Sequence, residues 1–152
     1  MRHTEPFDYQ REDLATIERM DGRALIASDV GVGKTLEALL FAYRNPQARP
    51  IIVVCPAVLK WNWAREASIH IGMRAEVLEG RRAAPFGLSI PQMVIVNFDI
   101  LIPTKAKKNG GPATPGWLPF LKELNPQIVI IDECFPAGTQ ITTNHGEIPI
   151  DE

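Results

Sequence analysis

The 152-residue sequence has little of what marks secreted and membrane proteins. Its two cysteines, Cys55 and Cys134, are too few for a disulfide framework, which favours a reducing compartment, the cytoplasm. The first residues lack the apolar core of a signal peptide, and no apolar run approaches the ~20 residues of a membrane span. A strong excess of charge is also absent, because 16 Lys and Arg face 18 Asp and Glu. This balance excludes a strongly basic nucleic-acid coat but not a local basic patch that binds phosphates.

What is present is an ordinary globular composition, with 45% apolar and 22% charged residues. Continuous apolar runs predict buried strands at 24–27, 51–55, 94–96 and 128–131. Helical spacing predicts helices at 12–20, 35–44 and 58–69, and a loop rich in Gly, Pro and Lys follows at 103–116. Buried strands separated by helices indicate an α/β fold, a parallel sheet with helices on both faces.

The strongest signal is a glycine-rich turn between a predicted strand and a predicted helix, Ser28-Asp29-Val30-Gly31-Val32-Gly33-Lys34-Thr35. Backbone N–H groups of Gly31, Val32 and Gly33 can wrap a phosphate at the positive end of the helix. Lys34 would reach the β- and γ-phosphates of ATP, and the Thr35 hydroxyl would ligate Mg²⁺. The full Walker pattern has glycine where Ser28 stands, but Gly-x-Gly-Lys-Thr is intact. The alternative is a chance glycine turn at a helix start.

An acidic pair supplies the partner that a phosphate loop needs. The predicted strand at 128–131 ends in Asp132 and Glu133. Asp132 would hold Mg²⁺ through water, and Glu133 would polarise the attacking water. The alternative is that the two carboxylates only mark the surface end of a strand.

Three further segments stand in a fixed order around the loop and the acidic pair: Phe7–Gln10, Val53–Trp63 and Val94–Leu101. Together the five segments resemble the motifs of the first RecA-like domain of superfamily 2 helicases and translocases, most closely the Swi/Snf branch. The resemblance implies a RecA-like fold and ATP hydrolysis with Mg²⁺, with Gln10 reading the adenine. It also implies double-stranded DNA as a partner and a second RecA-like domain that completes the ATPase site.

The same resemblance turns the segments around 56–63 and 97–101 toward a nucleic-acid strand. Lys60 and Asn97 are then candidates to contact phosphates, together with the lysines of the 103–116 loop, Lys105, Lys107 and Lys108. The alternative for these loop lysines is an ordinary solvated loop. For Trp61 and Trp63 we expect packing on a helix rather than base stacking.

The helicase pattern ends after Glu133. The family continues its acidic pair with Ala or Cys and then His, whereas Cys134 is followed here by Phe135-Pro136. The stretch 134–152 resembles the N-terminal block of an intein, the Hint-type self-splicing fold, in which the Cys134 thiol attacks the Glu133 carbonyl to form a thioester. Alternating residues on either side of the turn at 144–146 predict a β-hairpin that is part of an incomplete Hint fold.

These interpretations divide the chain into residues 1–133, a first helicase ATP-binding domain, and residues 134–152, an intein segment too short to build a Hint domain alone. The remaining intein fragment would be supplied downstream or in trans. The sequence leaves open whether the chain is half of a split intein or a truncated gene. It also leaves open two other interpretations, an inert nucleotide-binding module and a helicase fragment with a degenerate acidic motif and no intein.

Overall fold

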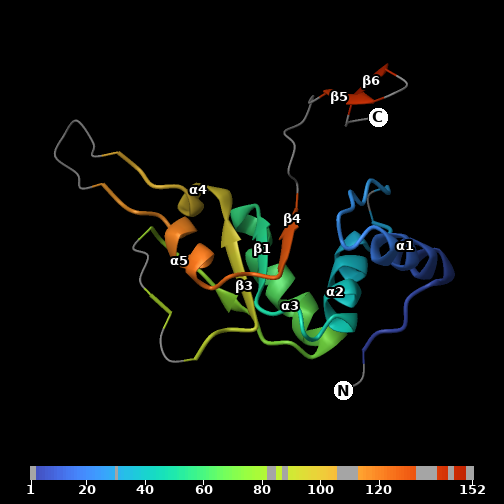
Figure 1. Cartoon of the computed structure of the whole chain (residues 1–152), viewed down its shortest axis with the longest axis horizontal. Coiled ribbons are helices and arrows are strands. Elements are labelled where there is room, and N and C mark those ends of the chain that lie inside the picture. The colour runs from blue at the N-terminus through green and yellow to red at the C-terminus, as the bar shows by residue number, and fades with distance from the viewer. Residues whose placement is uncertain are drawn as a thin grey trace.

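A computed structural model of the chain describes residues 3–29, 31–81, 85–86, 89–105, 113–132, 140–143 and 146–149. Its centre is a four-stranded parallel sheet in the order β2-β3-β1-β4 (Figure 1). The strands are β1 (Ile51–Cys55), β2 (Glu76–Val77), β3 (Met93–Asn97) and β4 (Ile128–Ile131). Every residue of β1 and β3 is buried, which explains why both read as continuous apolar runs.

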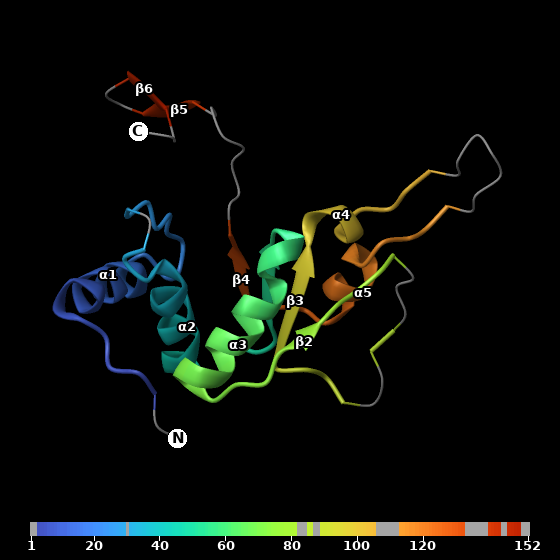
Figure 2. The ribbon, with the colours of Figure 1, turned by 180° about the vertical axis from the view of Figure 1, so that it is seen from behind.

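Helices cover both faces of the sheet, as the sequence predicted (Figures 1 and 2). Alternate residues of β1 belong to two separate cores, with Val53 in one and Ile52 in the other. The first core contains residues of the three long helices, α1 (Asp8–Arg19), α2 (Lys34–Arg44) and α3 (Lys60–Ile71). The second contains residues of the short helices α4 (Phe98–Leu101) and α5 (Leu118–Glu123). The α/β prediction is therefore confirmed.

Local signals account for the helix ends. Helix α2 ends before Asn45-Pro46, and the Asn45 side-chain amide donates to the Phe41 carbonyl, 2.8 Å away. A short 3₁₀ turn, η1 (Ala57–Leu59), precedes α3, which ends at Gly72 with φ of 63°. The predicted helices are confirmed, although α1 starts earlier than expected, at Asp8. In the described part of the chain, no helix is long and apolar enough to cross a membrane.

The strand predicted at 24–27 is wrong, because these residues are irregular and the Leu25 side chain is 62% exposed. Burial predicted for β4 is also wrong in part, since Val129 and Ile131 are 54% and 53% exposed. Both errors have one cause. Strand β4 is the edge of the sheet and pairs only with β1 among the described strands, and no described strand lies beside 24–27. An apolar run is buried only where a neighbouring element covers it.

The predicted C-terminal hairpin is present. Strand β5 (Gln140–Thr143) pairs antiparallel with β6 (Gly146–Pro149) in a sheet of its own, with Ile141 opposite Ile148. The turn residues 144–145 lie outside the described residues, as do residues 106–112 of the loop at 103–116, which we call the lysine loop. A bridge between Thr104 and Thr114 closes the base of that loop.

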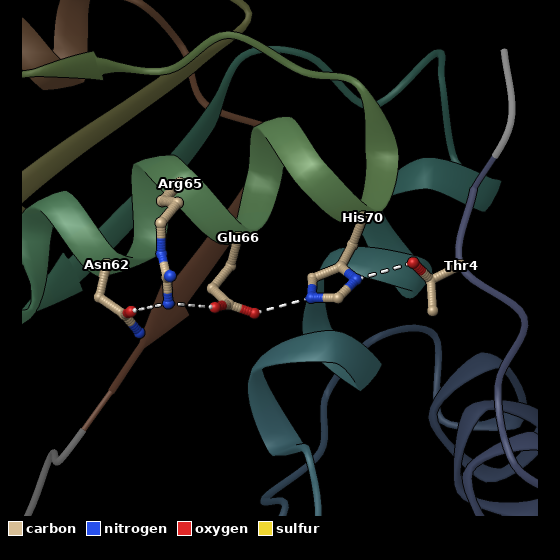
Figure 3. Close-up of polar contacts among 5 residues, drawn as sticks. All are labelled: Thr4, Asn62, Arg65, Glu66 and His70. Carbon is tan, nitrogen blue, oxygen red and sulfur yellow. Dashed lines mark hydrogen bonds and ion pairs between the residues drawn. The ribbon is translucent and has the colours of Figure 1, made fainter.

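A chain of polar contacts fastens the N-terminal segment to α3 (Figure 3). The Thr4 hydroxyl lies 2.7 Å from His70 Nδ1, and the Thr4 backbone N–H donates to the His70 carbonyl at 3.0 Å. His70 Nε2 lies 2.7 Å from Glu66, whose other oxygen accepts from Arg65, which also donates to Asn62. A ring protonated at Nε2 satisfies both of its partners. These contacts fix the point from which the chain enters α1.

The difference in burial across the sheet predicts a difference in stability. Ile95→Ala in β3, at a fully buried position, should lower the free energy of unfolding by ~2–5 kcal/mol through lost burial and a residual cavity. Ile131→Ala in the half-exposed edge strand should cost only about 1 kcal/mol. Urea unfolding followed by circular dichroism measures both. Equal losses would contradict the placement of β4 at the sheet edge.

Candidate nucleotide site

Two glycines of the loop before α2 adopt a backbone conformation that is typical of glycine-rich turns. Gly31 and Gly33 have φ of 86° and 92°, in the left-handed region that favours glycine, and α2 begins directly afterwards at Lys34. A Cβ on Gly33 would lie 2.6 Å from Gln10 Nε2, so a side chain does not fit there. A Cβ on Gly31 would meet nothing within 4 Å, so this part of the loop faces open space. The loop therefore offers a cradle at the N-terminus of an 11-residue helix.

Lys34 is folded back over the loop. Its Nζ donates to the carbonyl oxygens of Ser28 and Asp29, at 2.6 and 2.9 Å. The ammonium group is thus held at the loop by backbone oxygens, at the position that the sequence predicted for a phosphate partner. The Ser28 hydroxyl is buried and has no hydrogen-bond partner within the described ranges.

Two side chains of α1 hold the other side of the loop. Tyr9 Oη and Gln10 Nε2 both donate to the Val32 carbonyl, at 2.7 and 3.2 Å. Gln10 is 1% exposed, and its Oε1 accepts from the Phe7 backbone N–H at 3.1 Å, which also caps the start of α1. Gln10 therefore supports the loop backbone directly, and its predicted contact with adenine stays a prediction.

An open pocket of about 420 Å³ lies beside the loop, lined by Tyr9, Ala27, Ser28, Asp29 and Val32. The Tyr9 ring is stacked on Phe7, with centroids 5.9 Å apart and planes inclined by 12°. The pocket thus has one aromatic side chain beside the loop.

Asp132 follows the last residue of β4. Its backbone N–H donates to the Val54 carbonyl at 2.9 Å and so continues the pairing of β4 with β1. Its Oδ2 accepts a hydrogen bond from the indole Nε1 of Trp63, 2.8 Å away. Figures 1 and 2 show the end of β4 and the loop before α2 on the same side of the molecule, beyond the carboxyl ends of the strands. Glu133 and Cys134 lie outside the described residues.

The oxygen donors of Thr35 and Asp132 fit a hard cation such as Mg²⁺. Among the described residues, no group of three or more His, Cys, Asp or Glu could hold a metal on its own. A cation at this site would therefore need oxygens from another source, and nucleotide phosphates supply them. Together with the open cradle at Gly31, this donor set fits a magnesium nucleotide.

Sequence reasoning missed a buried carboxyl group in α2. Glu37 is 0% exposed, and neither of its oxygens meets an N–H or O–H donor in the described part of the chain. Burial raises the pKa of Glu37, the charge of Asp13 raises it further, and the Lys34 ammonium lowers it in part. The signal in the sequence was a glutamate one turn before Leu40, on the apolar side of a helix.

The candidate nucleic-acid contacts divide into two groups. Lys60 and Asn97 are buried, and Lys60 Nζ donates to the Leu78 carbonyl at 2.7 Å, so the prediction that these two side chains contact phosphates is wrong. Lys105 is exposed, whereas Lys107 and Lys108 lie outside the described residues. Packing was expected for both tryptophans of α3, but it holds only for Trp63, at 3% exposure, because Trp61 is 64% exposed. A polar group at a strand end is thus not always accessible.

Comparison with known proteins gives a consistent result. A family model described as SNF2-related domain matches residues 9–137. The DNA annealing helicase and endonuclease ZRANB3 of Mus musculus is 32% identical over 63 residues, 41% of this chain and 6% of that protein. The SWI/SNF-related matrix-associated actin-dependent regulator of chromatin subfamily A-like protein 1 of Xenopus tropicalis is 34% identical over 103 residues, which are 61% of this chain and 10% of that protein. The Zorya protein ZorD of Escherichia coli is 37% identical over 70 residues, which are 39% of this chain and 6% of that protein. The chain thus spans a tenth or less of these relatives.

The raised pKa of Glu37 gives a testable dependence of stability on pH. A carboxyl group whose pKa is raised by folding stabilises the fold at low pH, and this contribution is lost as pH rises from the ordinary value of 4.5 through the raised value. Glu37→Gln is neutral at every pH and has nearly the shape of the glutamate side chain. Its free energy of unfolding should therefore exceed that of the parent increasingly as pH rises, by about 1–3 kcal/mol at the plateau.

Thermal or urea unfolding between pH 4 and pH 8 measures this difference. The control is Glu123→Gln, at an exposed position of α5, for which no such trend is expected. A constant difference between Glu37→Gln and the parent across the range would contradict a raised pKa of Glu37 in the folded state.

Proposed function

The chain belongs to the SNF2-related domain family, and we propose that residues 1–133 form the ATP-binding first domain of a DNA-dependent ATPase of this family. One observation carries the proposal. The loop that ends in Lys34 and Thr35 lies at the start of α2, and the Asp132 carboxylate lies at the end of strand β4. This is the arrangement that places a phosphate, a cation and a water next to one another.

Each residue has a distinct part in the proposed reaction. The backbone of Gly31–Gly33 holds the phosphates, and Lys34 exchanges its two carbonyl partners for phosphate oxygens. Mg²⁺, when bound, neutralises charge on the β- and γ-phosphates, and Thr35 and Asp132 would hold it there. Glu133 would orient the attacking water. A second RecA-like domain would supply the arginine that this class of site needs, so the chain alone should turn over ATP very slowly.

The surface beyond β1 and β3 supports DNA as the partner. The two strands are adjacent and parallel, with Cys55 opposite Asn97, so the segments that follow them emerge side by side. Those segments expose apolar and aromatic side chains, Val58 at 87%, Trp61 at 64% and Phe98 at 39%. Exposed aromatic rings can stack on bases, and the lysine loop carries positive charge for phosphates. The names of several relatives also refer to DNA or to chromatin.

Nucleotide binding tests the proposal. Lys34→Ala removes the ammonium group at the loop and should weaken Mg-nucleotide binding by roughly 10- to 100-fold, since hydrogen bonds to charged groups are worth ~1.5–3 kcal/mol. Titration of a fluorescent ATP analogue into the purified chain measures the affinity. The control is Lys122→Ala, on α5 and far along the chain from the loop. Equal affinities for Lys34→Ala and the parent would contradict the phosphate-loop assignment.

We further propose that residues 134–152 are the opening segment of an intein inserted after the acidic pair. Three observations support this: the sequence resemblance that starts at Cys134, the departure from the helicase pattern directly after this residue, and the β5–β6 hairpin. In the first step the Cys134 sulfur attacks the Glu133 carbonyl carbon, and the peptide C–N bond breaks. The thiol proton ends on the freed α-amine, and a thioester remains. A complementary intein fragment would complete the Hint fold and supply the later steps.

Cysteine exchange tests the splicing proposal. The chain is mixed with candidate complementary fragments, and the masses of ligated products are followed over time. Cys134→Ala should abolish ligation, because alanine cannot form the thioester. Cys55→Ala removes the other cysteine, which is buried in β1, and should leave ligation intact. Ligation that persists in Cys134→Ala would remove this residue from the mechanism.

A further inference from the structure

The hydrogen bond between Trp63 and Asp132 joins residues that are 69 positions apart in the chain. Trp63 lies in the first turn of α3 and is 3% exposed, packed in the core with Leu39 and Val53. Its ring is therefore held on all sides, and its N–H is aimed at Oδ2 of the carboxylate at 2.8 Å. A buried indole N–H usually finds a partner, but any backbone carbonyl would serve for that purpose. Here the partner is the acidic residue that the proposed function assigns to the metal.

Among the described side chains, no other one competes with Trp63 for the Asp132 carboxylate. No Lys or Arg in the described ranges forms an ion pair with Asp132, and Trp63 is the one described side chain that donates to it. The bond occupies Oδ2, which leaves Oδ1 without a side-chain donor among the same residues. The backbone of Asp132 is fixed separately, by its N–H on the Val54 carbonyl. One side chain thus sets the rotation of the carboxylate.

The position of α3 is itself fixed near this point. Lys60, in the same helical turn as Trp63, is buried and donates from Nζ to the Leu78 carbonyl at 2.7 Å. At the other end, His70 carries the contacts to Thr4. The donor to Asp132 therefore stands on an element that is fastened at both ends.

We propose that Trp63 is a positioning residue for the cation site. Its indole N–H holds the Asp132 carboxylate with Oδ1 free for a hydrated Mg²⁺ that accompanies the nucleotide. Groups that orient metal-ligating carboxylates by hydrogen bonds change metal affinity ~10- to 100-fold when they are removed. The inference rests on the proposed nucleotide site, and it assigns to Trp63 a role that packing alone does not require.

The hydrogen bond can be observed without any ligand. The chain has three tryptophans, and Trp63→Phe assigns the indole N–H resonance of Trp63 in a ¹⁵N correlation spectrum. Asp132→Ala should move that resonance and speed its exchange with solvent, and should leave the indole resonances of Trp61 and Trp117 in place. A Trp63 resonance whose position and solvent exchange are the same in Asp132→Ala and the parent would overturn the proposal.

The positioning role is tested by the cation dependence of nucleotide affinity, measured in Mg²⁺ and in EDTA. Trp63→Phe keeps most of the ring but removes the donor, so the gain in affinity that Mg²⁺ gives should fall by about tenfold, while affinity in EDTA stays that of the parent. Trp117→Phe is the matched control. Trp117 is also buried, and its Nε1 donates to the Gly80 carbonyl at 3.0 Å, so this variant loses the same kind of bond elsewhere.

The outcomes are distinct. If the parent binds nucleotide and Mg²⁺ raises the affinity of Trp63→Phe as much as that of the parent, the positioning role is contradicted and the proposed function is not. A parent that binds no nucleotide in either condition contradicts the proposed function and the role of Trp63 with it. If Trp63→Phe does not fold, benzothienylalanine at position 63 replaces it, because this side chain has the shape of tryptophan and lacks the N–H. Loss of affinity in both conditions with this residue would mark a packing effect and overturn the proposal.

Discussion

Parallel pairing of β1 with both β3 and β4 determines where the acidic end of β4 and the proposed DNA surface lie. Because the carboxyl ends of parallel strands lie at the same end of a sheet, the segments that leave β1, β3 and β4 emerge on one side of it. The exposed Trp61 follows β1, Phe98 follows β3, and Asp132 follows β4. The loop before α2 lies on this side too (Figure 1), so the candidate nucleotide site and the proposed DNA surface share one side of the sheet.

Side chains from the long helices then hold this edge in shape. Gln10 and Tyr9 of α1 bind the Val32 carbonyl in the loop, and Trp63 of α3 binds Asp132. The Thr4 and His70 contacts connect the entry to α1 with the end of α3. The side chains that bind the loop before α2 and the side chain that binds Asp132 are therefore connected through α1 and α3. A change in the position of α3 would affect both sets of contacts.

The sequence predicted the elements whose signal is local and failed where burial depends on a neighbour. Buried β-branched runs identified β1 and β3, and Asn45-Pro46 identified the end of α2. The run at 24–27 is equally apolar, yet it is not a strand, because nothing in the run itself says whether another strand lies beside it. At the candidate site, Lys34 and Asp132 were proposed from residue type and spacing. The bond from Trp63 could not be, since it joins two segments through the packing of α3 on the sheet.

The edge strand β4 has a consequence for the behaviour of the chain at high concentration. Its outward backbone N–H and C=O groups pair with no described strand, and Val129 and Ile131 leave apolar surface around them. Such an edge is a template on which another copy can add a strand. Self-association of the chain should then begin at β4, next to Asp132, so that oligomers would crowd the carboxylate proposed for the cation site.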